Sequence, residues 1–462
     1  MRPLKHHSDE SLAPAYTSRS FARPIPKYDI PAAGLPADVA HQLVRDEMNL
    51  DGNPAMNLAS FVTTWMEPEA DRLLADTANK NLIDQDEYPQ TDEIHQRVIC
   101  MLARLFHAPP EAKPMGTATV GSSEAIMLGL LAHKFSWRKA RQAAGKPTDR
   151  PNVVFGADVH TCWEKFALYF DVEARIVPLE PDCHILTADR AAKYIDENTV
   201  AVGCILGTTF TGQIDEIGAI NALLAALKQQ HGWDIPIHVD AASGGFVAPF
   251  VYPELAWDFR LEHVRSINTS NHKYGLIYPG MGTVVFRDQH VVPQELIYKI
   301  TYLGGEMFNY SLNFSKPSSQ ILLQYYSFLR LGRAGYRQVM SNIMENSRYL
   351  EKMLLATGRF ELLNESKYLP VVVVKLKDPQ APSETLYHLS DVLRQHGWIV
   401  PAYPLPANAQ ETHVLRAVVK ENFSRDLAEK FAADVAAGLK KVDAMLGAVE
   451  KTLPQEKRQH VC

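Results

Sequence analysis

The chain has 462 residues, of which 46% are hydrophobic, and its 47 basic and 53 acidic residues give a formal net charge of −6. This length and composition suit a globular protein of two or three domains with a large core, and they argue against a disordered chain. No long basic stripe and no apolar run long enough to span a bilayer occurs, so we expect neither a nucleic-acid partner nor a membrane span.

The N-terminus and the cysteines indicate a cellular setting. Residues 1–10 lack the apolar core of a secretory signal. The five cysteines, Cys100, Cys162, Cys183, Cys204 and Cys462, follow neither metal-ligand spacing nor the even pattern of a disulfide framework. We therefore expect reduced thiols, no metal site and a cytoplasmic protein.

The first third of the chain predicts an arm followed by helices. Residues 1–35 are rich in Pro, Ser and His, which is typical of an arm that lies on another surface or is partly disordered. A helix is expected at about residues 36–49. Residues 119–144 predict a second helix, entered through a glycine-serine turn, whose apolar residues suit burial.

From about residue 150, apolar runs alternate with helical segments. Strands are expected at 152–156, 200–206, 235–240, 264–268 and 282–286, with helices at 161–170 and 216–230. Continuous apolar strands separated by helices favour an α/β fold with a mostly parallel sheet covered on both faces. Ligands of such sheets bind beyond the carboxyl ends of the strands, which is where Asp240 falls.

The last third of the chain has a different character. A long helical stretch at about 317–357 is followed by strands at 370–376 and 413–419 and by helices at about 383–396 and 424–446. This pattern predicts a small α+β C-terminal domain. We expect an N-terminal arm and helix at 1–56, a large domain at 57–343, and a small domain with a flexible tail at 344–462.

Asp240 and Lys273 are the residues that carry most information about chemistry. Asp240 ends an apolar run, and Lys273 lies in a loop of small, polar and aromatic residues. Pyridoxal phosphate (PLP) chemistry needs this pair: a lysine holds the cofactor as a Schiff base, and an acid keeps the pyridine nitrogen protonated so that the ring accepts electrons. Either residue alone is better explained as a surface lysine or a strand-capping aspartate, so the prediction depends on finding them together with the segments below.

Three other segments fit the same cofactor, and each has a purely structural alternative. Residues 121–125 place backbone N–H groups, Ser122 and Ser123 at a helix N-terminus, which suits a phosphate but also an ordinary helix cap. His160 follows a strand and suits stacking on a pyridine ring, or is a polar loop histidine. Residues 207–212 suit the phenolic oxygen of the cofactor, or form a threonine-rich turn.

These segments together resemble the glutamate decarboxylases, which are group II PLP-dependent decarboxylases of the aspartate-aminotransferase fold. The matching segments are residues 50–54, Glu87-Tyr88-Pro89, residues 121–125, residues 238–246 and Ser270-Asn271-His272-Lys273. The resemblance runs from about residue 36 to about residue 430. The first two segments point to the glutamate branch, and the pattern is that of the bacterial type.

The resemblance implies a role for each matching residue. It makes Lys273 the Schiff-base lysine, Asp240 the partner of the pyridine nitrogen, and Arg416 the residue that holds the substrate α-carboxylate. The other implied cofactor contacts are Ser122, Ser123, Ser270 and His272 at the phosphate end, Thr209 near the phenolic oxygen, His160 at the stacking position, and Ser315 from the neighbouring subunit. The best-studied bacterial forms have glutamine where this chain has His160.

The distal carboxylate of the substrate would meet Ser60, Phe61 and Asp84. The family's bacterial pattern has threonine before the phenylalanine, so Ser60 keeps the hydroxyl and lacks a methyl group. Two carboxylates at close range cannot both ionise cheaply, so Asp84 and the substrate should share a proton, which favours activity at acidic pH.

The implied reaction converts L-glutamate and a proton to 4-aminobutanoate (GABA) and CO2. Lys273 and His272 are both candidates for the acid that protonates Cα. Because the reaction consumes a proton, acid resistance is an expected role beside glutamate catabolism. The alternatives are a decarboxylase for another acidic or aromatic amino acid, a carbon–carbon lyase, and a catalytically silent scaffold protein.

The resemblance also implies partners and regulation. A homodimer is the expected minimal unit, because Tyr302, Leu303 and Ser315 match residues that reach the neighbouring site, and hexamers occur among bacterial members. His460 matches a histidine that closes the site at neutral pH; a disordered charged tail is the alternative. The C-terminus lacks the basic, tryptophan-containing stretch of a calmodulin target, so no calmodulin is expected.

Overall fold

The computed structural model describes residues 25–302, 305–363 and 367–452, with side chains described to residue 447. The chain forms two compact units, residues 1–54 and 55–462. The first contains helix α1 (Ala37–Met48), as the sequence predicts. The remaining elements belong to the second unit. Within the described ranges, no helix is both long and apolar enough to cross a membrane.

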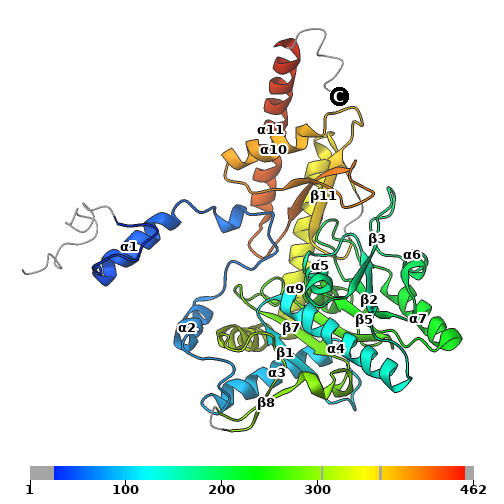
Figure 1. Ribbon diagram of the computed structural model, residues 1–462. Helices are drawn as coiled ribbons and strands as arrows, with labels where there is room; N and C mark the ends of the chain where they lie inside the picture. Colours follow the sequence, from blue (N-terminus) through cyan, green and yellow to red (C-terminus); the bar gives the residue numbers. More distant parts are fainter. Residues whose placement is uncertain (1–24, 303–304, 364–366, 453–462) are drawn as a thin grey trace, which may run out of the picture. The chain divides into compact units, whose positions relative to one another are not determined.

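A seven-stranded sheet forms the centre of the second unit (Figure 1). Its order is β1-β7-β6-β5-β4-β2-β3. Neighbours from β6 to β3 run parallel, and β7 runs antiparallel to both of its neighbours, β6 and β1. The strands are β1 (Met115–Thr119), β2 (Asn152–Gly156), β3 (Glu173–Val177), β4 (Thr199–Ile205), β5 (Ile237–Asp240), β6 (Val264–Thr269) and β7 (Gly282–Phe286). The prediction of a mostly parallel sheet is confirmed.

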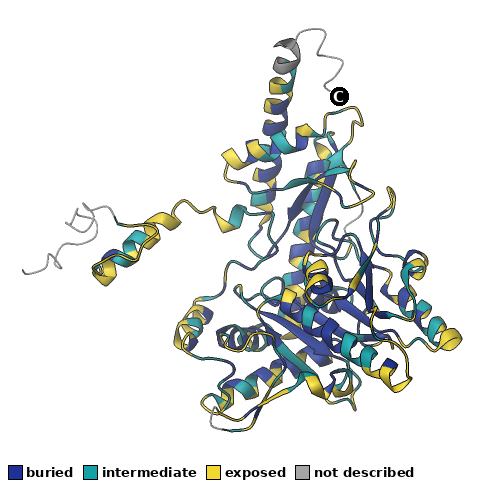
Figure 2. Ribbon diagram, in the orientation of Figure 1, coloured by how far each residue is buried: buried dark blue, intermediate teal, exposed yellow. Residues whose placement is uncertain are grey.

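Helices cover this sheet and bury its central strands, which appear dark blue in Figure 2. Every residue of β2, β4, β5 and β7 is buried, which explains their continuous apolar sequences. Helix α4 (Ser122–Ala143) packs across β4 to β7, and α3 (Pro89–Leu105) packs on β1 and β7. The other helices before residue 300 are α2 (Pro68–Thr77), α5 (Cys162–Tyr169), α6 (Ala188–Ala191), α7 (Ile217–His231) and α8 (Ala248–Val251).

A four-stranded antiparallel sheet follows in the last third of the chain, with the order β10-β11-β13-β12. Its strands are β10 (Phe360–Leu362), β11 (Val371–Leu376), β12 (Ala402–Pro404) and β13 (His413–Val418), and its helices are α10 (Glu384–Gln395) and α11 (Arg425–Thr452). Helix α9 (Ser319–Ala356) packs on α2 and α3 and also on β11 and α11, so it joins the two sheets (Figure 1). A hairpin of β8 (Tyr298–Ile300) and β9 (Met307–Asn309) precedes it.

Two predicted segments differ from the structure. Thr119, the predicted start of a helix, is the last residue of β1, a strand that the sequence did not predict because its small and polar residues lack an apolar pattern. A Cβ at Gly116 would lie 2.4 Å from the Val284 carbonyl, so β1 pairs closely with β7 only through glycine. The long predicted helix is two helices, because Gly332 breaks α9 with φ 57° and ψ −175°. A boundary between large and small domains at residue 343 stays a proposal.

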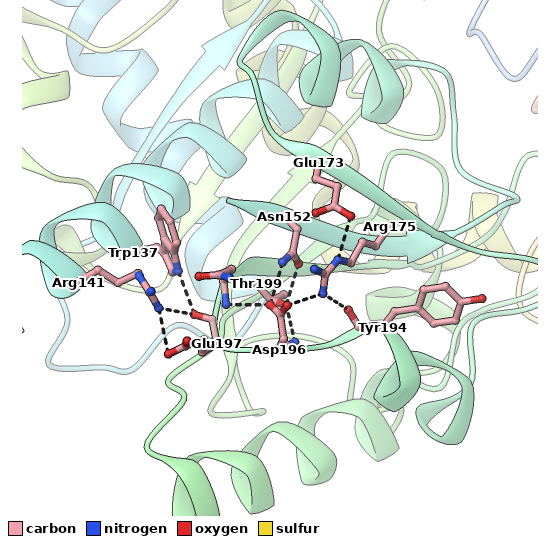
Figure 3. A network of polar contacts seen from close by, with 10 residues as sticks. Trp137, Arg141, Asn152, Glu173, Arg175, Tyr194, Asp196, Glu197 and Thr199 are labelled. Atoms are coloured by element: carbon pink, nitrogen blue, oxygen red, sulfur yellow. Dashed lines mark hydrogen bonds and ion pairs between the residues drawn. The ribbon is translucent and has the colours of Figure 1, made fainter. Parts of the chain in front are cut away.

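A polar network fixes the amino ends of β2 and β4 (Figure 3). Asn152 donates to Asp196 Oδ1 at 2.9 Å and accepts from Thr199 Oγ1 at 2.8 Å. Arg175 on β3 pairs with Asp196 at 2.8 Å, and Arg141 at the end of α4 donates to the Glu197 carbonyl at 3.1 Å. These contacts set the register of neighbouring strands, and therefore which residues meet at the carboxyl ends.

Candidate active site

A cavity of about 190 Å³ lies at the carboxyl ends of β2, β4 and β5. Its wall contains eight of the residues that the sequence singled out: Ser122, Ser123, His160, Thr209, Asp240, Ser270, His272 and Lys273. A larger cavity of about 490 Å³ opens at the amino ends of the strands and contains none of them. The parallel sheet therefore gathers these residues, which are far apart in sequence, at the edge where α/β proteins bind ligands.

Lys273 projects into this cavity from the loop after β6. Its amine donates to Ser243 Oγ at 3.1 Å, and its carbonyl accepts from Thr63 Oγ1 at 2.5 Å, which holds the loop. Burial lowers the pKa of the Lys273 amine, and the Arg416 guanidinium lowers it further, against the opposing charge of Asp240. A lowered pKa makes the neutral, nucleophilic amine more accessible near physiological pH.

Asp240 is the last residue of β5, and donors surround its carboxylate. Oδ1 accepts from Asn268 Nδ2 at 2.9 Å and from the Ala242 N–H at 3.1 Å, while Oδ2 accepts from Trp163 Nε1 at 3.3 Å. Hydrogen bonds of this kind stabilise the ionised form of a carboxyl group. The structure therefore supplies a fixed negative charge in the cavity wall, as the cofactor's pyridinium requires.

A chain of buried hydrogen bonds extends behind Asp240. Asn268 Oδ1 contacts His238 Nε2 at 2.8 Å, His238 Nδ1 contacts Ser266 Oγ at 2.7 Å, and Ser266 Oγ contacts His133 Nε2 at 2.6 Å. Burial lowers the pKa of His238 to about 4 and places that of His133 well below its ordinary value, so both rings are neutral. Since the amide oxygen of Asn268 only accepts, His238 carries its proton on Nε2, and Ser266 donates to the bare Nδ1.

Two glycines make room for the aromatic part of this arrangement. A Cβ at Gly203 on β4 would lie 2.4 Å from the Trp163 ring, and a Cβ at Gly129 on α4 would lie 2.5 Å from the His238 ring. Trp163 is fully buried and reaches Asp240 only because β4 has no side chain at that point. The two glycines therefore leave the space that the Trp163 and His238 rings occupy.

The opposite end of the cavity suits a phosphate. Helix α4 begins at Ser122, with Gly121 at φ 77°, so its free N–H groups face the cavity. Ser122 Oγ lies 2.6 Å from Ser270 Oγ, and Asn268 Nδ2 donates to Ser122 Oγ at 3.2 Å. His272 Nδ1 donates to the Met281 carbonyl at 2.7 Å, which leaves Nε2 for a ligand.

Arg416, on β13, lies next to the cavity and is 7% exposed. It donates to the carbonyls of Thr209 and Ala59, the latter at 2.6 Å, and its Nε has no hydrogen-bond partner among the described residues. The Phe61 ring lies between Arg416 and Lys273, 5.2 Å from the guanidinium carbon and 5.0 Å from the amine. In the described parts of the chain, no carboxylate forms an ion pair with Arg416, so the site offers a buried cation to an anion.

Besides Arg416, four predicted residues lie outside the cavity wall: Ser60, Phe61, Asp84 and Ser315. Ser60 Oγ accepts from the Val62 N–H at 3.1 Å, beside Phe61. Asp84 and Ser315 lie in two adjoining loops: the Asp84 N–H donates to the Asn81 carbonyl at 3.2 Å, and Asn81 Nδ2 donates to Ser315 Oγ at 3.4 Å. Within one chain, neither Asp84 nor Ser315 lines the cavity.

His460 and Leu303 lie outside the described residues. Tyr302 is 74% exposed, and its ring stacks on Phe314 with the centroids 6.5 Å apart.

Sequence reasoning missed several residues of the site. Trp163, Asn268 and Ser243 contact Asp240 or Lys273, and Asp158 lines the cavity. Ser243 follows Asp240 in a glycine-rich turn, which is a usable signal, whereas Trp163 and Asn268 read as core residues of a helix and a strand. Cys162, for which the sequence favours a packed core thiol over a place near the cofactor, also lines the cavity, and burial raises the pKa of its thiol to about 12, so it is neutral.

The arrangement fits bound PLP. It provides hydroxyl and N–H donors at one end, a carboxylate held by three donors at the other, a lysine between them, and His160 at the rim of the cavity. In the part of the chain that the structure describes, no three His, Cys, Asp or Glu side chains gather in a way that would hold a metal ion.

Comparison with known proteins agrees with this chemistry. Residues 27–377 match the pyridoxal-dependent decarboxylase conserved domain. The chain is 49% identical to glutamate decarboxylase 2 of Arabidopsis thaliana, covering 96% of this chain and 90% of that protein. It is 44% identical to glutamate decarboxylase beta of Listeria innocua, covering 95% of both. The structure of Lactobacillus brevis glutamate decarboxylase superposes with a TM-score of 0.89 at 43% identity, covering 92% of this chain and 97% of that one. The chain therefore belongs to the pyridoxal-dependent decarboxylase family and, within it, to the glutamate decarboxylases.

Proposed function

We propose that this protein is a PLP-dependent enzyme that decarboxylates L-glutamate to 4-aminobutanoate and CO2. The observation that carries the proposal is the Arg416 guanidinium, which is buried beside Lys273 with no carboxylate partner among the described residues. A buried cation of this kind costs free energy unless an anion binds to it. The substrate α-carboxylate is such an anion, and the family relationship identifies the substrate class.

PLP, when bound, accepts the electron pair that the departing CO2 leaves behind. Asp240 holds the negative charge that this chemistry needs at the cavity wall. Arg416 binds the α-carboxylate and sets its direction, with Phe61 as a rigid apolar wall that keeps water away. Lys273 and His272 both lie close enough to the cavity to give a proton to Cα, and the reaction then consumes one proton overall.

Ser60, Phe61 and Asp84 are proposed to recognise the distal carboxylate of glutamate. Ser60 and Phe61 follow Ala59, whose carbonyl accepts from Arg416, so this segment lies beside the proposed substrate site. Asp84 shares its loop with Asn81, whose amide contacts Ser315. We propose that Asp84 and Ser315 both serve the site of a neighbouring subunit.

A surface next to this loop supports a homodimer as the minimal unit. Ile83 packs with Ile300 and Met307 of the β8–β9 hairpin, and large apolar side chains are exposed on and after this hairpin. They are Tyr298 (66%), Tyr302 (74%), Phe308 (57%), Leu312 (48%) and Phe314 (38%). Exposed apolar groups gathered in this way are typical of a protein interface. A hexamer of such dimers is the larger alternative.

The test of the function is a glutamate decarboxylation assay across pH, with the Lys273→Ala variant as control. The wild-type protein should release CO2 from glutamate and carry the cofactor's absorbance, and Lys273→Ala should lose both. A panel of other acidic and aromatic amino acids should give at least tenfold lower kcat/KM, because their side chains would not place a carboxylate at Asp84 and Ser60 as glutamate does. Faster turnover of another amino acid would overturn the assignment of glutamate.

A role in acid resistance is proposed from proton consumption, and His460 is proposed to close the site near neutral pH. Imidazole titrates in the range where such closure would act. A chain that ends at Leu453 should stay active at a higher pH than the full chain. An unchanged pH profile would remove His460 from the proposal without affecting the reaction itself.

A further inference from the structure

Two buried carboxyl groups, Asp158 and Asp215, lie at the β2 and β4 side of the cofactor cavity. Asp158 follows β2 by two residues, is 1% exposed and lines the cavity. Neither of its oxygens has a hydrogen-bond partner within the described residues. Asp215 is 3% exposed, and its oxygens accept from the Leu186 N–H at 2.7 Å and the Ile205 N–H at 2.6 Å.

The two groups influence each other's ionisation. Burial raises the pKa of Asp158 to about 7 and raises that of Asp215 well above its ordinary value, and ionisation of one group disfavours ionisation of the other. In the described ranges neither carboxyl forms an ion pair. The charged or titratable groups around them are Arg190 of α6, Asp240 of β5, Cys204 of β4, and His160, Cys162 and Lys273 in the cavity wall.

The surroundings decide which group holds the proton. Two carboxylates buried together cannot both ionise cheaply, so the pair keeps one proton at and below neutral pH. Both oxygens of Asp215 already accept from backbone N–H groups, and such bonds favour the ionised form. No other described residue donates to the Asp158 oxygens, so the proton resides on Asp158.

We propose that neutral Asp158 is a positioning residue for the cofactor: its carboxyl O–H offers a hydrogen bond to bound PLP, and Asp215 keeps that proton in place. This role rests on PLP as the cofactor of the proposed function. A buried polar group that faces a cavity without a partner is costly, and a bound ligand satisfies it. Arg190 does not replace the ligand, because it donates to the Ile185 carbonyl at 3.0 Å and pairs with Glu180 at 3.6 Å.

A pH dependence follows from this role. As the pH rises above about 7, Asp158 loses its proton and can no longer donate. The cavity then holds an additional negative charge close to an anionic cofactor, so cofactor affinity should fall by up to about tenfold per pH unit. Asp158→Asn keeps a donor of similar size that cannot ionise, and it should therefore remove this dependence.

The experiment measures how much cofactor the holoenzyme retains on dilution, by absorbance, between pH 5.5 and 8.5. Between pH 7 and pH 8 the dissociation constant of the wild-type holoenzyme should rise at least fivefold more than that of Asp158→Asn. Asp158→Leu, which has no donor, should bind PLP at least tenfold more weakly than wild type at pH 6. Asp149→Asn, an exposed change, should follow the wild type.

Parallel pH dependence in wild type and Asp158→Asn would overturn the proposal, and so would wild-type affinity at pH 6 in Asp158→Leu. If Asp158→Asn does not fold, Asp215→Asn replaces it: without the Asp215 charge, Asp158 should ionise more easily and cofactor loss should begin at lower pH. If cofactor loss in Asp215→Asn begins at the same pH as in the wild type, that result would also contradict the proposal. Glutamate turnover is a separate measurement, so failure of the reaction assignment would leave the cofactor titration interpretable.

Discussion

Asn268 and Asp240 lie opposite each other on the paired strands β6 and β5, and the Asn268 amide donates to Asp240 Oδ1 at 2.9 Å. The same amide nitrogen also donates to Ser122 Oγ at 3.2 Å. One fully buried side chain therefore connects the carboxylate end of the cofactor cavity with its phosphate end. The neutral His238 ring fixes the orientation of this amide from behind.

Replacing Asn268 with leucine should weaken cofactor binding. The change removes a hydrogen bond to a carboxylate, which is worth about 1.5–3 kcal/mol, so the PLP dissociation constant should rise about 10–100-fold. Titration of cofactor absorbance measures this. Asn342→Leu, on an exposed face of α9, is the control and should bind PLP like the wild type. Equal affinity of Asn268→Leu and wild type would show that Asp240 does not depend on this amide.

Replacing Arg416 with lysine should reduce kcat/KM for glutamate about 100-fold or more, while PLP stays bound. A lysine keeps the charge but lacks the fork of donors that a carboxylate accepts from, and it cannot contact both Thr209 and Ala59 as the guanidinium does. Steady-state kinetics with glutamate measures the effect. The control is Arg359→Lys, which should leave kcat/KM unchanged, because Arg359 is a half-buried residue that pairs with Asp443 at 2.7 Å. A similar kcat/KM in both variants would exclude Arg416 as the carboxylate-binding residue.

Mixed dimers test whether Asp84 acts in the neighbouring site. Lys273→Ala and Asp84→Ala chains should each be nearly inactive alone, because each lacks one group at every site. In a mixed dimer, one site combines Lys273 from one chain with Asp84 from the other, so co-expression should restore activity. Co-expression of Lys273→Ala with Arg416→Ala is the control, since both residues lie in the same chain's site.

In that control, each site of the mixed dimer lacks one of the two groups, so no site is intact and co-expression should restore no activity. Co-expression of Lys273→Ala with Asp84→Ala should therefore restore activity only if Asp84 acts in the site of the neighbouring subunit. If Lys273→Ala plus Asp84→Ala gives no more activity than the separate chains, Asp84 serves its own chain.

The buried histidines should make the protein less stable in acid. The pKa of His238 is lowered to about 4 in the folded protein, against about 6.5 when unfolded, so the unfolded state binds more protons and stability is lost as the pH falls between these values. The contribution is about 2–3 kcal/mol at pH 4.5. His238→Gln should therefore lose less stability between pH 7 and pH 4.5 in urea unfolding, whereas the exposed His290→Gln should behave as wild type.

The ionisation of Asp158 changes the pH dependence of stability in the opposite direction to that of His238. Its pKa is raised in the folded state, so the stability that it contributes is lost as the pH rises from about 4 to about 7. Asp158→Asn should consequently lose more stability than wild type on acidification, relative to its own value at pH 7. Changes of the same sign in His238→Gln and Asp158→Asn would contradict the assigned charge states.

Replacing Gly203 with alanine should destabilise the protein by about 1–3 kcal/mol, because the new methyl group would lie 2.4 Å from the Trp163 ring. The displaced indole should also weaken its bond to Asp240, so PLP affinity should fall with stability. Gly218→Ala is the matched control, since no atom lies within 4 Å of the new Cβ on helix α7. It should leave stability unchanged or raise it by up to about 1 kcal/mol. Thermal unfolding of both variants decides between the two effects.

The sequence by itself predicted the parallel strands β2, β4, β5 and β6, but not β3, and it indicated the chemistry. The apolar runs at 152–156 and 282–286 correspond to β2 and β7 residue for residue, because strands buried on both faces need continuous apolar sequence. Lys273 and Asp240 were recognisable because few other functions need a lysine and an aspartate in those settings. The edge strand β1 was not predicted, because its position depends on pairing with β7 rather than on its own pattern.

Only the tertiary structure decided which other side chains join the site. Trp163, Asn268 and His238 come from a helix and two strands, and in sequence each resembles an ordinary core residue. Their roles arise from strand order and from the missing side chains at Gly203 and Gly129, which no local pattern encodes. The fold likewise placed Asp158 close to Asp215, because long-range packing, not sequence spacing, sets the distances on which charge interactions depend.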